Sequence, residues 1–599
     1  MKEHDVTECD KAGISRRDLL RDATVAGAAA ALATPAAAGA RGRKRATAKR
    51  TVAVLGGGMG GLAAAHELAE RGFAVTVYER KALGGKARSI PTDLPATGGR
   101  APLPGEHGFR FFPGFYHHVP DTMRRIPFPG NADGVRGNLV SAPTAVISLV
   151  GQEDLTVPFG ITSETPTAIT PEDLADTLVG ALKVGAQVPP HELLLFVNRL
   201  MVFMTSCDAR RLGQWEDVSW IDFIKADGRS QAYRKLLGAG LTRGLVAAKE
   251  EIASSRTIGN MAEAFVLNIL GRGNDGDPDR VLNAPTNEAW IDPWVAHLRT
   301  LGVEFRMGWD VRSLKVADGA IEAAGAKDGQ GRKRRIDADW FVCALPCERA
   351  VKLFNHKVLA VDPGLEAVNR LVVDWMNGIQ FFLKRDAPLT KGHMAYMSSP
   401  WSLTSINQAQ FWRRHDLPRD FGDGTVKDIL SVDISDWDAK GIRFGKPAKE
   451  CSRQEIAEEV WAQIKASVND RRGGKLRDED LHSWYLDPAI QWSASAGSNT
   501  NEEPLLINTV GSWKDRPTAR TKVRNLVLAA DYVRTDIDLA TMESANEAGR
   551  AATNAILEAS GSTADHARMF RLYDPPELAG AKAVDAQRYA AGLPNVLDL

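Results

Sequence analysis

Three glycines and one glutamate have the spacing of a loop that binds a dinucleotide. Gly56, Gly58 and Gly61 follow the apolar run TVAVL, and Glu79 ends a second apolar run roughly 20 residues further on. Glycines allow a tight turn and a close approach to a pyrophosphate, whose charge faces the amides at the start of the next helix. A glutamate at this place accepts hydrogen bonds from a ribose diol and argues against a 2′-phosphate. The loop therefore favours FAD or NAD over NADP.

The elements around this loop form one strand–helix–strand unit. TVAVL predicts a buried parallel strand, GGLAAAHELAERG a helix that stops at Gly72, and FAVTVYE the next strand. IDADWFVCALP and RNLVLAADYV predict further strands, and ATMESANEAGRAATNAILEA predicts a strongly periodic helix. Helical patterns also occur at residues 193–204, 262–269 and 284–301. We therefore expect an α/β protein whose doubly wound, Rossmann-type domain is assembled from three chain segments and interleaved with a mixed α/β domain.

The residues after Glu79 resemble a known family. The stretch RKALGGKARS, residues 80–89, resembles the double-glycine signature of the flavin amine oxidase and phytoene desaturase superfamily. There the loop brings backbone and a cationic side chain to the FAD diphosphate, so the resemblance implies FAD; Lys86 stands where an arginine is usual. GEHGFRFFPGFYHHVPDTMRRI is similar to plant-type phytoene and ζ-carotene desaturases, with Arg110 where those proteins tend to have a histidine. Hydroxysqualene dehydroxylase-like FAD oxidoreductases belong to the same group.

The end of the chain extends the resemblance. NLVLAADYVRTDIDLATMESANEAGRAA is similar to the C-terminal flavin motif of the superfamily. Asp531 would then bind the ribityl or diphosphate part, and Thr541 and Met542 would open a helix whose N-terminus stabilises negative charge on reduced flavin. In the middle strands, the backbone at Val311 would hold the adenine side. The cofactor-binding residues expected from the loop and from the resemblance are Gly56, Gly58, Met59, Gly60, Gly61, Glu79, Arg80, Gly85, Lys86, Arg88, Val311, Asp531, Thr541 and Met542.

These features divide the chain into seven segments. Residues 1–46 carry an export signal and a basic linker. The FAD-binding domain is expected at 47–135, 276–350 and 505–560. The substrate domain is expected at 136–275, where it is helical, and at 351–504, and residues 561–599 form a C-terminal tail.

No arrangement of Ser, His and Asp, of paired glutamates or of metal ligands stands out, which fits an enzyme whose cofactor carries the chemistry. His107, Arg110 and Tyr116 lie where the resemblance places the active cavity and are the candidate catalytic residues. The alternative is structural, because FRFFPGFYHH also reads as an aromatic strand and turn in the core. We expect no metal site, since His117 and His118 have no carboxylate or cysteine at ligand spacing.

Three functions remain open. The first is desaturation or dehydrogenation of an apolar isoprenoid or lipid-like substrate, by hydride transfer to flavin N5, with reoxidation by oxygen or a quinone. The second is the oxidation of an amine or amino acid, and the third is a redox-neutral isomerisation or dehydroxylation with FAD bound. The plant-type desaturase resemblance favours the first. A fourth alternative is a structural protein that binds FAD without catalysing a reaction.

Composition excludes some classes of function. The 599 residues contain 75 Lys plus Arg and 75 Asp plus Glu, so the formal net charge is zero and a general nucleic-acid binder is not expected. The five cysteines are scattered, with no Cys-x-x-Cys pair, so a disulfide framework does not stabilise the fold.

The first residues have the pattern of a twin-arginine export signal. Ser15-Arg16-Arg17-Asp18-Leu19-Leu20 precedes an alanine-rich run that ends in small residues. The twin-arginine machinery carries folded proteins, so FAD inserted in the cytoplasm would be exported in place. We therefore expect a protein of the periplasm, cell envelope or medium. Its partners would be this machinery, a small substrate and an electron acceptor, with a peripheral membrane contact left open.

Overall fold

The computed structural model of the chain describes residues 50–151, 153–158, 188–469 and 475–598. The signal and basic linker expected at residues 1–46 lie outside the described residues. Within the described part, every helix is too short or too polar to cross a bilayer. The cysteines in this part, Cys207, Cys343, Cys347 and Cys451, are free and buried.

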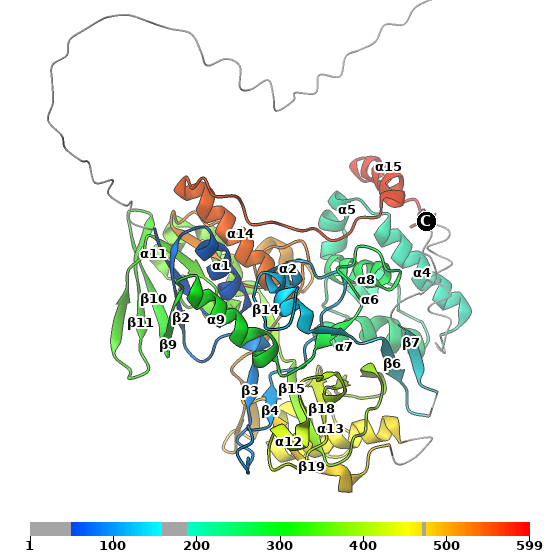
Figure 1. Cartoon of the computed structure of the whole chain (residues 1–599). Coiled ribbons are helices and arrows are strands. Elements are labelled where there is room, and N and C mark those ends of the chain that lie inside the picture. The colour runs from blue at the N-terminus through cyan, green and yellow to red at the C-terminus, as the bar shows by residue number, and fades with distance from the viewer. Residues whose placement is uncertain (1–49, 152, 159–187, 470–474, 599) are drawn as a thin grey trace, which may run out of the picture. The chain divides into compact units, whose positions relative to one another are not determined.

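A five-stranded parallel sheet is built from the beginning, middle and end of the chain (Figure 1). Its strands are ordered β23 (Leu526–Leu528), β13 (Trp340–Cys343), β1 (Thr51–Leu55), β2 (Ala74–Glu79) and β9 (Glu304–Met307). Val52, Val54 and Leu55 of the central strand are almost completely buried, as expected for a sheet covered on both faces. The structure therefore confirms the predicted doubly wound domain assembled from three segments.

Helices from distant parts of the chain pack around this sheet. Helix α1 (Met59–Glu70) packs against α14 (Met542–Ser560) and also contacts α9 (Asp292–Thr300). An antiparallel sheet of β10 (Asp310–Ala317), β11 (Ala320–Lys327) and β12 (Lys333–Ile336) follows β9 in the chain, and α11 (His356–Val361) packs against β10.

A seven-stranded mixed sheet forms the core of the second domain. Its strands are ordered β19 (Leu481–Leu486), β15 (Asn377–Leu383), β18 (Asp428–Ile434), β17 (Thr404–Asn407), β16 (Gly392–Tyr396), β6 (Thr144–Ser148) and β7 (Leu155–Pro158). Only β16 and β6 pair in parallel among these neighbours. Helix α13 (Arg453–Val468) begins with a capping box between Ser452 and Glu455 and buries Ile456, Val460 and Ile464 in the same hydrophobic core.

The helical part of the second domain has its own hydrophobic core, in which α4 (Pro190–Met204) packs against α8 (Ser255–Ile269). The end of the chain folds onto this part. Helix α15 (Ala579–Ala590) contacts α5 (Asp208–Gly213), and the buried Asp585 carboxylate lies 3.0 Å from Nε of Arg210. Residues 561–598 are therefore bound to the domain through buried contacts.

Shorter elements connect these parts. They are β3 (Ser89–Pro91), β4 (Pro104–Glu106), α2 (His118–Arg124), β5 (Leu139–Ser141), α6 (Trp220–Phe223), α7 (Arg243–Val246), β8 (Arg280–Leu282), α10 (Cys347–Ala350), β14 (Val372–Asp374), α12 (Leu417–Asp420), β20 (Ile490–Ser493), β21 (Ser498–Asn501) and β22 (Leu505–Ile507).

The contact between α1 and α14 depends on two glycines. A Cβ at Gly60 would overlap the carbonyl oxygen of Ala529, the residue after β23. A Cβ at Gly549 would lie 2.6 Å from the carbonyl oxygen of Gly60 and 2.9 Å from Cβ of Ala63. The two helices therefore approach closely enough that neither position has room for a methyl group.

We predict that Gly549→Ala lowers the melting temperature of the protein. Because the atoms around this glycine are mostly backbone and cannot move aside, overpacking should lower the free energy of unfolding by about 1–3 kcal/mol. Gly580→Ala is the matched control, since Gly580 lies in α15 with no atom within 4 Å of its Cβ position. That substitution should leave stability unchanged or raise it by up to about 1 kcal/mol. Equal melting temperatures for the two variants would contradict the close contact.

Candidate active site

A cavity of about 1120 Å³ lies at the carboxyl ends of the parallel strands and extends over the seven-stranded sheet. Gly56 follows β1, Glu79 ends β2, and Ala344 and Ala529 follow β13 and β23; all four line the cavity. Open α/β sheets bind their ligands at this edge. Single-ligand pockets usually measure about 300–1,000 Å³, so this cavity has room for a cofactor and a substrate.

The glycine loop leaves its backbone open to the cavity. Gly56 has a φ of 109°, a conformation that favours glycine. A Cβ at Gly58 would meet no atom closer than 3.9 Å. The Glu79 carboxylate accepts hydrogen bonds from the backbone N–H of Gly57 at 2.8 Å and of Lys81 at 2.6 Å. These bonds hold the carboxylate beside the loop, and its remaining lone pairs can accept from a ribose diol.

Lys86 and Arg88 lie on the second glycine loop, which contacts the first. A Cβ at Gly85 would lie 3.0 Å from Cα of Gly58. Nζ of Lys86 donates to the carbonyl oxygen of Pro504, and Nη1 of Arg88 donates to that of Gly85 at 2.5 Å. Both side chains line the cavity, so two cationic groups lie near the loop where a diphosphate would bind.

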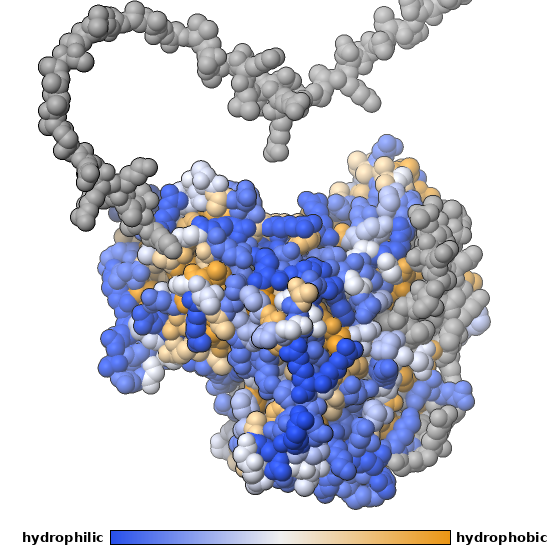
Figure 2. Space-filling model, viewed as in Figure 1, coloured by the Kyte–Doolittle hydropathy of each residue, from blue (hydrophilic) through white to orange (hydrophobic). Residues whose placement is uncertain are grey.

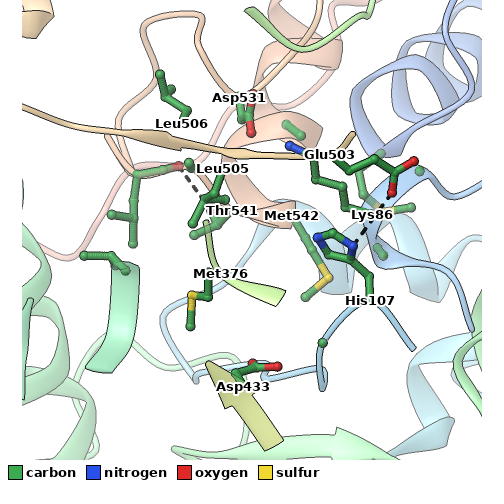
Figure 3. Close-up of a pocket in the computed structure, with 18 of the residues that line it drawn as sticks. Lys86, His107, Met376, Asp433, Glu503, Leu505, Leu506, Asp531, Thr541 and Met542 are labelled. Atoms are coloured by element: carbon green, nitrogen blue, oxygen red, sulfur yellow. Dashed lines mark hydrogen bonds and ion pairs between the residues drawn. The ribbon is translucent and has the colours of Figure 1, made fainter. Parts of the chain in front are cut away.

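The N-terminus of α14 faces the same cavity. Oγ1 of Thr541 caps the helix by accepting from the backbone N–H of Ser544 at 3.1 Å, and Thr541 and Met542 line the cavity (Figure 3). The positive end of the helix dipole therefore points at bound ligand. Burial raises the pKa of the Tyr116 phenol, with Thr541 acting in the opposite direction, so Tyr116 stays neutral.

Helices α2 and α14 are linked by hydrogen bonds from His117 and His118 to Glu543. The Glu543 carboxylate accepts from the backbone N–H groups of His117 and His118 and from Nδ1 of His118 at 2.9 Å. Nε2 of His118 accepts from the backbone N–H of Phe570 at 3.0 Å, so its Nδ1 carries the proton. Burial alone would raise the pKa of Glu543, but these donors lower it. Both histidines therefore have structural partners.

His107 and Arg110 lie on the segment that crosses the seven-stranded sheet. Nδ1 of His107 lies 2.6 Å from the Asp487 carboxylate and 3.7 Å from that of Glu503, as Figure 3 shows for Glu503. Arg110 is turned back on its own segment, where Nη2 donates to the carbonyl oxygen of Gly108. Burial lowers the pKa of the guanidinium from its usual range, although nearby Glu106 and Asp433 oppose this.

The part of the cavity over the seven-stranded sheet is mostly apolar. Phe111 stacks on Phe265 with ring centroids 6.0 Å apart, and Met376 and Leu505 also line the wall. In Figure 3, Asp433 lies on the other side of Met376 and Met542 from Asp531. The titratable groups that line this part include Asp433 and the pair of Asp279 and His393, whose Oδ2 and Nδ1 atoms are 2.7 Å apart.

The structure brings nearly all of the predicted site residues to this one cavity. The three candidate catalytic residues, His107, Arg110 and Tyr116, line it. So do all the cofactor-binding residues expected from the sequence except Gly61, which packs against the carbonyl oxygen of Gly56. Asp433, His393 and Asp279 were not found from the sequence. The signal for Asp433 was a lone acid in the otherwise apolar end of the strand DILSVDI.

The residues present fit FAD. The open backbone at Gly58, the fixed acid Glu79 and the cations Lys86 and Arg88 suit an adenosine diphosphate. The N-terminus of α14 suits a ring that gains negative charge on reduction. The apolar part then remains for a substrate beside the ring.

Comparisons with known proteins identify relatives of the chain. A family model for an NAD(P)-binding Rossmann-like domain matches residues 54–126, and one for flavin-containing amine oxidoreductases matches residues 280–557. Carotenoid phi-ring synthase from Streptomyces griseus is 26% identical to the chain over 543 residues, which cover 85% of this chain and 87% of the synthase.

Solved structures show the same fold. Cyclohexylamine oxidase from Brevibacterium oxydans aligns with a TM-score of 0.55 and 13% identity, over 86% of this chain and 100% of the oxidase. A putrescine oxidase bound to putrescine aligns with a TM-score of 0.54 and 12% identity, over 85% of this chain and 99% of that enzyme. An oxidoreductase from Methanosarcina mazei aligns with a TM-score of 0.54 and 13% identity, over 85% of this chain and 100% of that oxidoreductase.

We predict that Glu79→Ala weakens FAD binding by about ten- to hundredfold, because a lost hydrogen bond to a charged group costs roughly 1.5–3 kcal/mol. Titration of the apoprotein with FAD, followed by flavin fluorescence, measures this change. The control is Glu304→Ala on the neighbouring strand β9, whose carboxylate is exposed and pairs with Arg306. An unchanged dissociation constant in Glu79→Ala would show that this carboxylate does not bind the ribose.

Proposed function

We propose that this chain, which belongs to the flavin amine oxidase and phytoene desaturase superfamily, dehydrogenates an apolar, isoprenoid-like substrate with FAD as its cofactor. The observation that carries the proposal is the apolar character of the cavity over the seven-stranded sheet. Phe109, Phe111, Phe265, Met376 and Leu505 line this part. Affinity for a substrate here would come from buried apolar area.

Arg110, the arginine among the candidate catalytic residues, is engaged within its own segment and lies among acidic groups. Arg110 donates to Gly108 within its own segment and lies close to the Asp433 and Glu106 carboxylates. An amino-acid carboxylate held by Arg110 would lie near these two acids. The relationship to a carotenoid synthase, which covers most of both chains, also supports an isoprenoid substrate.

Bound FAD supplies a hydride acceptor, and the chain's own residues would align and enclose the substrate. The stacked Phe111 and Phe265 rings exclude water from the apolar wall. Thr541 and Met542 bring the N-terminus of α14 to the flavin side of the cavity. Oxygen or a quinone would then reoxidise the cofactor.

We further propose that the mature protein acts outside the cytoplasm, because of the twin-arginine pattern at residues 15–20. A peripheral membrane contact would give access to lipid substrates. Exposed Leu194 on α4 and exposed Leu593, Val596 and Leu597 near the C-terminus support this contact. Nδ2 of Asn198 on α4 donates to the carbonyl oxygen of Leu597, so these residues are neighbours. Figure 2 shows hydrophobic residues among hydrophilic ones around α15.

Anaerobic mixing of the holoenzyme with candidate substrates tests the reaction. Isoprenoid lipids with allylic C–H bonds should bleach the flavin, and amines or amino acids should not. Added salt should leave the KM for the lipid nearly unchanged, because screening weakens ion pairs but not apolar contacts. Rapid bleaching by an amine, with none by any lipid, would replace this proposal by amine oxidation.

Export is tested by replacing the arginine pair. Arg16→Lys with Arg17→Lys should leave the protein in the cytoplasm with FAD bound, because the export machinery reads the pair itself. Cell fractionation with immunoblotting measures the distribution. The control keeps the pair and carries Arg41→Lys and Arg43→Lys in the basic linker. Export of both variants at the wild-type level would contradict a twin-arginine signal.

A further inference from the structure

Asp433 lies on β18, the outermost of the neighbouring strands whose residues form the cavity floor. In the register of the sheet, it pairs with Thr404 on β17, and Thr404 pairs with Ala395 on β16. Directly opposite residues of antiparallel strands share a face. All three line the cavity, so the Asp433 side chain points from the floor toward the substrate space.

The segment at residues 107–110 packs directly on this carboxylate. On β15, Gly378 pairs with Asp433 and its N–H donates to the carbonyl oxygen of His107 at 2.6 Å. A Cβ at Gly108 would lie 2.7 Å from Oδ1 of Asp433. The Asp433 carboxylate therefore lies next to the segment at residues 107–110. The His107 side chain of the same segment lies beside Met542 in Figure 3.

Asp433 is buried without a full set of partners. Its side chain is 7% exposed, and its Oδ1 has no hydrogen-bond partner among the described residues. The N–H of Phe109 and the Arg110 guanidinium act on the carboxyl group and lower its pKa, but no described cation lies within 4 Å of its oxygens. A buried polar oxygen left without a partner costs free energy, which points to a ligand-facing role.

The surroundings of Asp433 favour its neutral form. Burial raises its pKa to about 7, with a further contribution from Glu106 in the same direction. Arg110, the N–H of Phe109 and His393 act in the opposite direction. A carboxyl group with this pKa exchanges a proton with its surroundings near neutral pH, as general acids and bases in enzymes do.

We propose that Asp433 is the catalytic base that takes up the proton lost by the substrate during dehydrogenation. The inference rests on the proposed function. Forming a C=C bond from two adjacent C–H bonds removes two hydrogens. One leaves with its electron pair as a hydride to the bound cofactor. The other leaves as a proton to Asp433, and the electron pair of that C–H bond becomes the new π bond.

Other groups around the cavity are less suited to this step. His107 is paired with Asp487, and Glu503 lies in a charge network with Lys81 and Arg88. The phenol of Tyr116 is held neutral by burial. Burial also raises the pKa of Asp279, and its Oδ1 has no hydrogen-bond partner among the described residues, but its Oδ2 is paired with Nδ1 of His393 at 2.7 Å. His393 lies on β16, two strand spacings from β18, or roughly 10 Å.

Asp428 shows what a structural acid on the same strand looks like. It is also buried, and burial raises its pKa to about 6. Its carboxylate accepts from Nδ2 of Asn407 at 2.6 Å and from the backbone N–H of Ile429 at 2.8 Å. It does not line the cavity. Asp428→Asn is therefore the matched control for Asp433→Asn.

Stopped-flow flavin reduction by an isoprenoid lipid, in holoenzyme of both variants, tests the catalytic role. Asp433→Asn should slow reduction by about 100-fold or more while FAD binding stays unchanged, because a positioned base contributes roughly 10²- to 10⁴-fold. In the wild type the rate should rise with pH through about 7, since the base must be ionised. Asp433→Asn should lose this dependence, and Asp428→Asn should keep both the rate and the dependence.

Infrared titration of the holoenzyme provides a readout that does not need turnover. Burial also raises the pKa of Glu547 to about 7 and that of Asp428 to about 6, so the spectrum of Asp433→Asn is subtracted from that of the wild type. The difference spectrum should contain the C=O band of a protonated carboxyl, which should disappear as the pH rises through about 7. Wild-type reduction rates in Asp433→Asn, or no such band, would overturn the proposal. If no isoprenoid lipid reduces the wild-type flavin, the proposed function fails, and the titration still decides whether Asp433 exchanges a proton near neutrality.

Discussion

The close contact between α1 and α14 is the constraint on which the rest of the site depends. The glycine loop at Gly56 to Gly61 and the helix that begins at Met542 lie at opposite ends of the chain, and they meet because Gly60 and Gly549 carry no side chain. Because of this contact, the backbone of the glycine loop and the N-terminus of α14 line the same cavity. An extra methyl group here would separate the half of the site that suits the diphosphate from the half that suits the flavin ring.

The seven-stranded sheet forms the floor of the substrate part of the cavity. This floor is apolar, and each titratable group exposed to it costs desolvation energy unless it is paired. His107 has Asp487, and His393 has Asp279. Asp433 keeps an oxygen without a partner, and burial raises its pKa. The chain therefore combines a polar, charged cofactor half with a largely apolar half, in which the Asp433 carboxylate has no ion pair with any described residue.

The sequence predicted the cofactor half well, because its signals are local. Gly56, Gly58 and Glu79 lie within one strand–helix–strand unit, whose order in the chain is also its order in space. The floor of the cavity was not predicted, since β6, β16, β17 and β18 become neighbours only when the sheet forms. Asp433 stands in an apolar strand, but nothing local shows which face of that strand meets the cavity. The packing of α15 on α5 depends in the same way on a long-range pair, Arg210 with Asp585.

The proposed reaction requires an apolar substrate to lie between the flavin side of the cavity and the floor at Asp433. An experimental structure of the anaerobic holoenzyme with an isoprenoid lipid would show where the substrate binds. Lipid density should follow the face that carries Ala395, Thr404 and Asp433. One allylic carbon should lie roughly 3–3.5 Å from the reactive flavin atom, the spacing of reacting atoms in a productive complex. Lipid bound elsewhere, or a floor closed over Asp433 by protein side chains, would contradict this placement.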